Sequence, residues 1–264
     1  MNKPGEEPLL SLPERHSRIL SLLQQNGSIS VTQLSELFKV SEVTIRKDLS
    51  YLEQQKKLYR THGSAILISP YISDRHVNEK EKNNVAEKRA IGAAAAALVS
   101  QDDSIIIASG TTMAFLAREI KPVGRLTVIT AAVPVTQILS QHADVDVIQL
   151  GGITRSSSVS VVGPFAESML RNFNCSKLFV GVDGIDTEFG LTTTNMLEAS
   201  LNGAMINAAQ KVVVLADSSK FGRRGFSKIC DLEAVDRIIT DSGVQPLYLE
   251  RLRERGIEVT VVDV

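Results

Sequence analysis

The chain has 264 residues, 43% of them hydrophobic, and a formal net charge of −1 at pH 7. This length allows one large domain or two ordinary ones, and the apolar content supplies material for a buried core. A near-neutral chain has no overall positive field that would indicate nucleic-acid binding, but the charge is split, with +2 on residues 1–62 and −3 on the remainder.

Several classes of protein are excluded by what the sequence lacks. Cys175 and Cys230 lie far apart without CxxC spacing, which is typical of reduced thiols in a cytosolic protein. The four histidines are scattered, so we expect no metal site. No apolar run approaches the length of a membrane span, and the first ten residues do not resemble a signal peptide. We therefore expect a soluble, cytoplasmic protein with no metal, cofactor or membrane partner.

Three short helices are predicted in succession near the N-terminus, at residues 14–25, 31–38 and 41–54. Ser30 and Gln33 match a capping box and predict where the second helix begins. Ser41 is a suitable N-cap for the third helix. In that helix Ile45, Leu49 and Leu52 recur at helical spacing, so they predict a buried face.

Two extended runs follow the third helix, at 57–61 and 64–67, and indicate a β-hairpin. Three helices with a hairpin are the arrangement of a winged helix-turn-helix, in which the third helix enters the major groove of DNA. Arg46 and Lys47 can reach guanine edges or phosphates, and amides at the helix start can hold a phosphate. The candidate DNA contacts are Ser41, Thr44, Arg46, Lys47, Tyr51, Lys57, Arg60 and His62. The alternative is an ordinary interaction domain with a solvated basic face.

About fifty residues of this region resemble a known family. The segment RHSRILSLLQQNGSISVTQLSELFKVSEVTIRKDLSYLEQQKKLYRTHGSAI is similar to the winged helix-turn-helix of DeoR-type regulators, most specifically in VSxxTIRxDLxxLE and R-x-HG. The resemblance implies that the partner of this region is a double-stranded DNA operator.

The remainder of the chain has a different pattern. Residues 69–84 are polar and charged, which predicts a linker between a winged helix-turn-helix domain at 1–68 and a second domain at 85–264. An alanine-rich helix at 85–99 leads into apolar runs that alternate with helical segments, which predicts an α/β fold with a mainly parallel sheet covered on both faces. The predicted strands are 104–108, 126–130, 145–150, 177–182, 211–216, 237–240 and 257–262.

Polar and glycine-rich motifs follow the ends of several predicted strands. Ligands of open α/β sheets bind at the carboxyl ends of the strands, so these motifs are expected to meet. Amides, hydroxyls and cations suit a phosphate and carboxylates suit hydroxyl groups, which together predict a polyol phosphate as the ligand. Any single motif could instead be a structural turn. The candidate effector-binding residues are Ser109, Gly110, Thr111, Thr112, Gly152, Arg155, Asp183, Asp186, Glu198 and Lys220.

Residues 85–262 resemble the DeoR-type C-terminal sensor domain in GGITRxxxxSxxG, GVDGID, LTTxNxxEA and DSSKFGR. The resemblance implies a fold similar to ribose-5-phosphate isomerase and a sugar-phosphate pocket lined by Asp183, Asp186 and Lys220, with Thr111, Thr112, Arg155 and Glu198 nearby. The chain departs from the family pattern where Ala108, Ala131 and Asn202-Gly203 replace polar or basic residues, so the resemblance does not specify the sugar.

These features predict a transcription regulator with no catalytic residues. We expect a repressor of carbohydrate-catabolism genes, a homodimer or homotetramer, that a phosphorylated sugar or sugar alcohol releases from its operator. One alternative is a phosphosugar isomerase-like enzyme with a DNA-binding appendage, in which Glu198 or Asp183 is the base and Lys220 polarises the substrate. Another is a constitutive architectural or activator protein whose cleft is vestigial.

Overall fold

The computed structural model describes residues 11–264 except 27, 56, 62–63, 68–75 and 123. The chain divides into two compact units, Met1–Pro70 and Tyr71–Val264. Among the described residues, no helix is long and apolar enough to cross a membrane.

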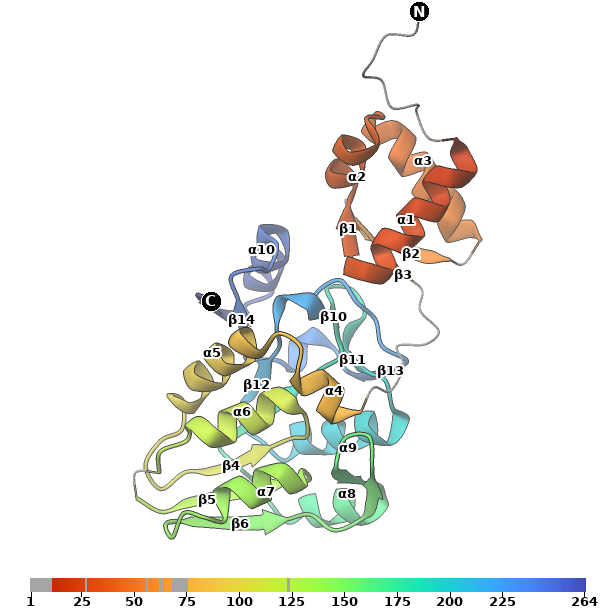
Figure 1. Cartoon of the computed structure of the whole chain (residues 1–264). Helices are drawn as coiled ribbons and strands as arrows, with labels where there is room; N and C mark the ends of the chain where they lie inside the picture. Colours follow the sequence, from red (N-terminus) through yellow and green to blue (C-terminus); the bar gives the residue numbers. More distant parts are fainter. Residues whose placement is uncertain (1–10, 27, 56, 62–63, 68–75, 123) are drawn as a thin grey trace, which may run out of the picture. The chain divides into compact units, whose positions relative to one another are not determined.

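The first unit consists of three helices and a small antiparallel sheet (Figure 1). The three predicted helices form, as does the predicted hairpin, to which a short strand after the first helix adds a third member. The elements are α1 (Leu12–Asn26), β1 (Ser28–Ser30), α2 (Val31–Phe38), α3 (Glu42–Gln54), β2 (Leu58–Thr61) and β3 (Ser64–Leu67), with strand order β1-β3-β2.

The boundaries of α2 and α3 follow from local chemistry. Ser30 and Gln33 form the expected capping box, which satisfies amide groups that the first turn of α2 leaves unpaired. Lys39 ends α2 in the left-handed conformation, with φ of 53°, and reverses the chain toward α3. Each helix then buries one apolar stripe in a shared core that includes Ile19 and Leu34.

The second unit is built on a seven-stranded sheet in which every pairing is parallel. All seven predicted strands are present, because long β-branched runs can be buried on both faces of such a sheet. The strand order is β15-β14-β12-β9-β4-β5-β6. The strands are β4 (Ser104–Ile107), β5 (Leu126–Thr130), β6 (Val145–Gln149), β9 (Lys177–Gly181), β12 (Val212–Leu215), β14 (Arg237–Asp241) and β15 (Glu258–Val262).

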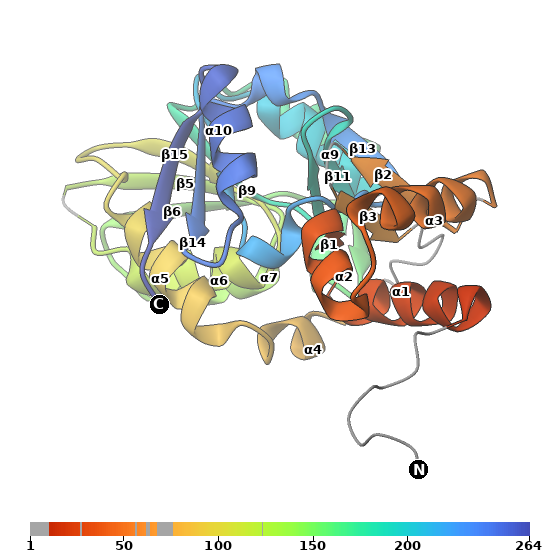
Figure 2. The ribbon, with the colours of Figure 1, turned by 90° about the horizontal axis from the view of Figure 1, so that it is seen from above.

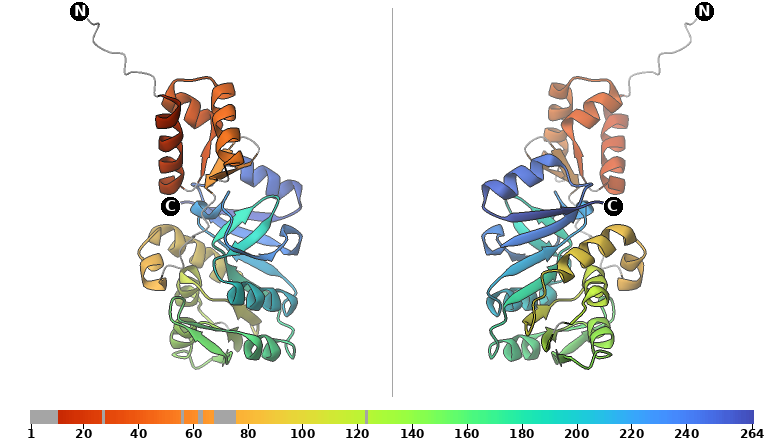
Figure 3. Two further views of the ribbon diagram at one scale, coloured as in Figure 1. Left: turned by 90° about the vertical axis from the view of Figure 1, so that its right-hand side faces the viewer. Right: turned by 90° about the vertical axis from the view of Figure 1, so that its left-hand side faces the viewer.

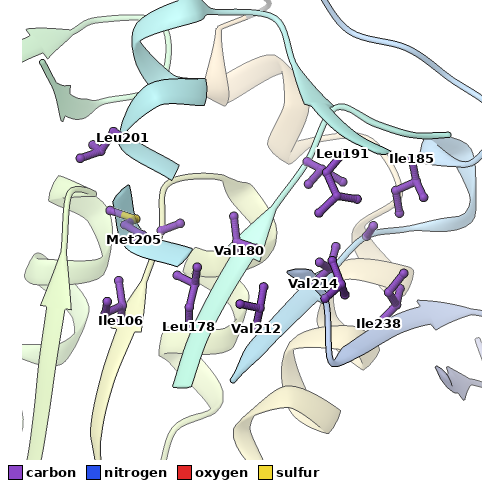
Figure 4. Close-up of a cluster of buried hydrophobic side chains, with 14 of the residues drawn as sticks. Ile106, Leu178, Val180, Ile185, Leu191, Leu201, Met205, Val212, Val214 and Ile238 are labelled. Carbon is purple, nitrogen blue, oxygen red and sulfur yellow. The ribbon is translucent and has the colours of Figure 1, made fainter. Parts of the chain in front are cut away.

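Helices cover both faces of this sheet (Figures 2 and 3). One apolar cluster joins the sheet to α5, α6 and α7, and a second joins its other face to α8, α9 and α10. Neighbouring residues of one strand alternate between the clusters: Ile105 belongs to the first and Ile106 to the second, part of which Figure 4 shows. The helices are α5 (Val85–Ala96), α6 (Thr111–Glu119), α7 (Val133–Leu139), α8 (Pro164–Leu170), α9 (Met196–Asn207) and α10 (Pro246–Glu254).

Smaller elements complete the second unit. They include the hairpin β7–β8, the antiparallel sheet β10-β11-β13 and two short 3-10 turns. Their bounds are β7 (Ile153–Arg155), β8 (Ser160–Val162), β10 (Gly184–Asp186), β11 (Gly190–Thr193), β13 (Ser227–Cys230), η1 (Ser218–Lys220) and η2 (Leu232–Ala234).

The predicted linker at 69–84 contains a short helix, α4 (Val77–Glu81), which belongs to the second unit and packs beside α6. Glu81, one of the charged side chains that favoured a solvated linker, has a partner in the second unit, since it accepts a hydrogen bond from Arg118 at 3.0 Å. Residues 77–81 of the predicted linker therefore form a helix of the second unit.

Candidate functional site

Helix α3 turns its apolar side inward, as predicted. Ile45 and Leu49 are fully buried and Leu52 is 1% exposed. The Ser41 hydroxyl accepts a hydrogen bond from the Thr44 amide at 3.2 Å, and the two hydroxyl oxygens lie 2.9 Å apart. Both hydroxyls, which were predicted to contact DNA, thus take part in the cap that begins the helix.

The outward face of α3 is cationic and open to solvent. Arg46, Lys47 and Tyr51 are exposed on it, and they line a shallow hollow together with Val43, Ser50 and Gln54. Arg46 donates a hydrogen bond to Glu42 at 2.5 Å. Because an exposed pair of this kind is worth at most about 1 kcal/mol, a DNA phosphate or base can take the place of Glu42.

A buried ion pair supports α3 from behind, and the sequence reasoning missed it. Asp48 is 3% exposed and accepts hydrogen bonds from Arg15 of α1 at 2.6 and 3.1 Å. His16 lies 3.2 Å from the same carboxylate, and its ring stacks on that of Tyr51. The hydrogen bond that Arg15 donates to Asp48 raises the pKa of Arg15. A charged residue within the predicted apolar face of α3 was the signal that could have revealed this pair.

The hairpin contributes two exposed cations, Lys57 and Arg60. The Arg60 amide donates to Glu53 at 2.9 Å and its guanidinium donates to Ser50 of α3, so the hairpin is tied to the third helix. The remaining predicted contact of the hairpin, His62, lies outside the described residues.

In the second unit, Asp183 lies at the centre of a polar cluster at the carboxyl ends of the strands. Its carboxylate accepts hydrogen bonds from Lys80 at 2.9 Å, from the Thr193 hydroxyl at 3.1 Å, and from the amide and hydroxyl of Thr194 at 3.2 Å each. Burial would raise the pKa of Asp183, but the charges of Lys80 and Lys220 outweigh it and hold the pKa below its usual value. The carboxylate is therefore ionised at neutral pH.

Glu198 joins three further segments to this cluster. It lies in the first turn of α9, and its backbone amide donates a hydrogen bond to the side chain of the N-cap residue Asn195 at 3.1 Å. Its carboxylate accepts the Ser109 hydroxyl at 3.0 Å and the guanidinium of Arg155, which also donates to Ser157 at 2.9 Å. Burial and the charge of Asp183 raise the pKa of Glu198. Four residues predicted from separate motifs, Ser109, Arg155, Asp183 and Glu198, are thus brought together.

Lys220 is the last residue of η1, whose N-cap is Asp217. Burial would raise the pKa of Asp217, but the charge of Lys220 and a hydrogen bond from Ser219 keep it low. Asp217 also accepts a hydrogen bond from Asn84 at 2.9 Å. Lys88, which the sequence reasoning missed, is 5% exposed, and its burial lowers its pKa. A lysine on the same side of α5 as the buried Ile91 and Ala95 was the available signal.

The remaining candidates occupy different positions. Asp186 points away from this cluster: it accepts two hydrogen bonds from Arg224, at 2.8 and 3.0 Å, and two from backbone amides of its own turn. Gly110 is the N-cap of α6 with φ of 131°, a backbone conformation that favours glycine, and Thr111 and Thr112 follow it in the buried first turn. Gly152 is exposed, and a Cβ there would lie 2.7 Å from the Val162 carbonyl oxygen.

The departures from the family pattern leave apolar groups at two strand ends. Ala108 and Ala131 are 0% and 1% exposed, and both belong to one of the core clusters. Their methyl groups pack into the core, so neither position offers a polar group to a ligand.

The cluster contains both cations and carboxylates. Lys80, Lys220 and Arg155 are cations that can bind a phosphate, and Asp183 and Glu198 are acceptors for hydroxyl groups. Among the residues that the structure describes, no group of histidines, cysteines and carboxylates is placed to hold a metal ion.

Two family models match the chain, one over each part. The DeoR-like helix-turn-helix domain matches residues 15–71, and the DeoR C terminal sensor domain matches residues 83–242.

Curated relatives are similar over almost the full length. The uncharacterized HTH-type transcriptional regulator YulB of Bacillus subtilis (strain 168) is 39% identical and covers 94% of this chain and 96% of its own. The putative aga operon transcriptional repressor of Escherichia coli O157:H7 is 38% identical and covers 98% and 97%. Among solved structures, ribose 5-phosphate isomerase A from Methanocaldococcus jannaschii has a TM-score of 0.39 at 17% identity and covers 53% of this chain and 55% of its own.

Proposed function

The chain belongs to the DeoR family of transcription regulators, and we propose that it represses carbohydrate-catabolism genes until a phosphorylated sugar or sugar alcohol releases it from its operator. The observation that carries this proposal is the cluster around Asp183, where cations and carboxylates from separate segments meet at the carboxyl ends of the strands. Such a cluster matches a ligand that has both a phosphate and hydroxyl groups.

The DNA-binding half of the proposal rests on α3. Its exposed Arg46 and Lys47 can contact bases or phosphates while Ile45 and Leu49 stay buried. One winged helix has a small footprint, so we propose that a homodimer or homotetramer binds inverted half-sites. The name of the aga operon repressor supports repression as the direction of control.

Release requires that the effector bind the DNA-bound and free forms unequally. A coupling free energy of about 1–3 kcal/mol changes operator affinity by roughly 5- to 150-fold, which is sufficient for control. We place the effector between Lys220, Asp183 and the Arg155–Glu198 pair, with Ser109 and the first turn of α6 at its edge.

The test is a gel-shift titration of the full chain on DNA upstream of its own and neighbouring genes, repeated with a panel of hexose, hexitol and amino-sugar phosphates. We expect tight, salt-dependent binding that one member of the panel weakens at least fivefold. If binding is tight but no member of the panel weakens it, effector release is excluded for these compounds.

An isomerase-like enzyme is the second candidate, and the raised pKa of Glu198 beside Asp183 is the observation in its favour. We propose that the pocket binds without turnover, since Glu198 is held by Arg155 and Ser109. Incubation with the same panel, followed by product analysis, separates the two. Turnover of any phosphosugar supports the enzyme, and binding without turnover supports the regulator.

A thermal-shift screen distinguishes the proposed effector-controlled regulator from a constitutive architectural protein or activator. A ligand that binds the native state raises the melting temperature according to its concentration and affinity. A rise with one sugar phosphate supports a functional pocket, whereas no rise with any of them supports a vestigial one.

A further inference from the structure

Residues 77–84 form a strap across the polar cluster of the second unit. The strap consists of α4 and the turn that leads into α5, and it begins seven residues after Pro70, where the first unit ends. Figure 1 shows α4 beside α6. Its position makes it the first described element of the sensor unit that follows the DNA-binding unit along the chain.

The strap is attached to several parts of the pocket. The Val77 amide donates to the Ser157 carbonyl at 2.6 Å, and Ser157 also accepts a hydrogen bond from Arg155. Asn84 donates to Asp217 at 2.9 Å. Near its middle, Lys80 donates to Asp183 at 2.9 Å. These three attachments therefore end on the cluster in which we place the effector or on a residue bonded to it, whereas Glu81 of the strap is paired with Arg118 of α6.

The C-terminal end of α4 is stabilised by the buried Lys88. Its ammonium donates to the Lys80 carbonyl at 2.8 Å and to the carbonyl of Asn83. The charges of Lys220 and Asp217 also act on Lys88, so the strap and the pocket share one electrostatic network. Lys88 therefore links the backbone that carries Lys80 to the charges of Asp217 and Lys220.

Each member of the Lys80–Asp183 pair can instead bind one group of a sugar phosphate. A phosphate competes with Asp183 for the ammonium of Lys80, and a hydroxyl competes with Lys80 for the carboxylate of Asp183. The side chains are 31% and 13% exposed, so a ligand in the pocket can reach both. Ligand binding and the closed strap are thus alternatives at the same atoms.

We propose that Lys80 contacts the effector directly, exchanging Asp183 for the effector's phosphate, and that this exchange detaches α4 and lowers operator affinity. The inference rests on the proposed function and adds to it a further effector-contacting residue and the element that reports its occupancy. It also assigns a direction: the closed strap belongs to the form with high DNA affinity.

The test compares three full-length variants without any sugar phosphate. Lys80→Met removes the cation that holds Asp183, Lys80→Arg keeps a cation there, and Lys82→Met is the matched control, because Lys82 is exposed on the same strap. We expect Lys80→Met to speed amide hydrogen exchange in residues 77–84 and to weaken operator binding by about 5- to 150-fold. Lys80→Arg should restore both, and Lys82→Met should change neither.

Two outcomes overturn the inference. One is wild-type exchange in residues 77–84 of Lys80→Met; the other is unchanged operator affinity despite faster exchange. If the melting temperature of Lys80→Met is unchanged, any effect of this variant is not a loss of folding. If the melting temperature falls, the Lys80→Arg variant alone decides: wild-type operator binding and normal exchange in that variant support the role of the Lys80–Asp183 pair.

A fourth measurement uses glucose 6-phosphate and glucitol 6-phosphate as probes on the wild type and on Lys80→Met. A probe that releases the wild type should bind Lys80→Met at least fivefold more weakly. If no sugar phosphate releases the wild type, the proposed function fails, while the exchange and operator results on the ligand-free variants still decide whether the strap controls DNA binding.

Discussion

The two units place their functional side chains in opposite environments. On α3 the cations Arg46 and Lys47 are exposed, and Arg46 is paired with Glu42 one helical turn away. In the sensor unit, Asp183 and Glu198 are largely buried, and their partners come from segments far away along the chain. An exposed charge is free to meet DNA, whereas a half-buried network is complete only when every member is satisfied.

Exposed and buried charge pairs should respond differently to substitution. Removing one member of an exposed pair changes stability by less than about 1 kcal/mol, whereas removing one partner of a buried pair leaves a charge without compensation. The first unit contains both kinds, because the exposed face of α3 is supported by the buried Arg15–Asp48 pair. Substitutions at exposed and at buried charges of the two units should therefore have effects of different size.

The largest effect is expected from Asp48→Ala, which leaves Arg15 buried without its carboxylate. We expect the free energy of unfolding of the first unit to fall by about 3–5 kcal/mol. Native-state hydrogen exchange of the α3 amides in urea measures this change. A loss below about 1 kcal/mol would show that the buried pair behaves like a surface pair.

The next largest effect concerns Asp186 and its pH dependence. Asp186→Asn removes charged hydrogen bonds with Arg224 and should cost about 2 kcal/mol at pH 7. Burial raises the pKa of this carboxyl, but Arg224 and two backbone amides lower it below its ordinary value of 3.8. The stabilisation is therefore present above about pH 4 and is lost as pH falls through the lowered pKa.

Urea denaturation of the wild type and of Asp186→Asn at pH 7 and pH 3 tests this sign. We expect the two proteins to converge at the lower pH, and a constant difference would refute the assignment. Asp146→Asn is the control, because Asp146 forms an exposed pair with Arg125 and should cost less than about 1 kcal/mol.

Lys220→Ala should separate the two units functionally. We expect operator binding close to that of the wild type, while release by the active sugar phosphate is lost. The lost release corresponds to a coupling free energy of about 1–3 kcal/mol. Gel shifts with and without the compound measure both quantities. Lys211→Ala is the matched control, because Lys211 is exposed just before β12, the strand whose other end leads to η1. Normal release of the Lys220→Ala variant would remove Lys220 from the effector site.

Lys47→Ala should act on DNA binding alone. If Lys47 contacts one phosphate, the slope of log affinity against log salt becomes shallower by about 0.9. Arg46→Ala should flatten the slope similarly, and Lys121→Ala, an exposed lysine of the sensor unit, should not. An unchanged slope for both α3 variants would exclude this face from the DNA interface.

The smallest effect is expected from Glu42→Ala, which breaks the exposed pair with Arg46. A pair at this spacing on a helix contributes about 0.3–0.5 kcal/mol to stability. Urea denaturation should therefore show almost no change, in contrast to Asp48→Ala six residues later in the same helix. A loss comparable to that of Asp48→Ala would erase the distinction between the two kinds of pair.

Sequence patterns were sufficient for the regular elements. The capping box at Ser30, the apolar spacing of Ile45, Leu49 and Leu52, and the seven β-branched runs each correspond to an element of the structure. These features depend on local chemistry and on the period of side chains along one segment, and both can be seen without knowing the fold.

The short elements could not be predicted in this way. β1, β7, β8 and α4 have three to five residues each, too few for a periodic pattern, and they exist because a neighbouring segment pairs with them or packs against them. The buried Arg15–Asp48 pair was missed for a similar reason, since its members lie 33 residues apart.

By itself, the sequence determined the two-part organisation, the parallel sheet and which strand ends carry polar motifs, because periodicity and strand polarity are properties of single segments. Only the tertiary structure decided which of those motifs share one site. It joined Ser109, Arg155, Asp183 and Glu198, turned Asp186 toward Arg224, and placed Lys80 on Asp183. Which charges meet depends on how distant segments pack, and that packing minimises unpaired buried charge across the whole domain.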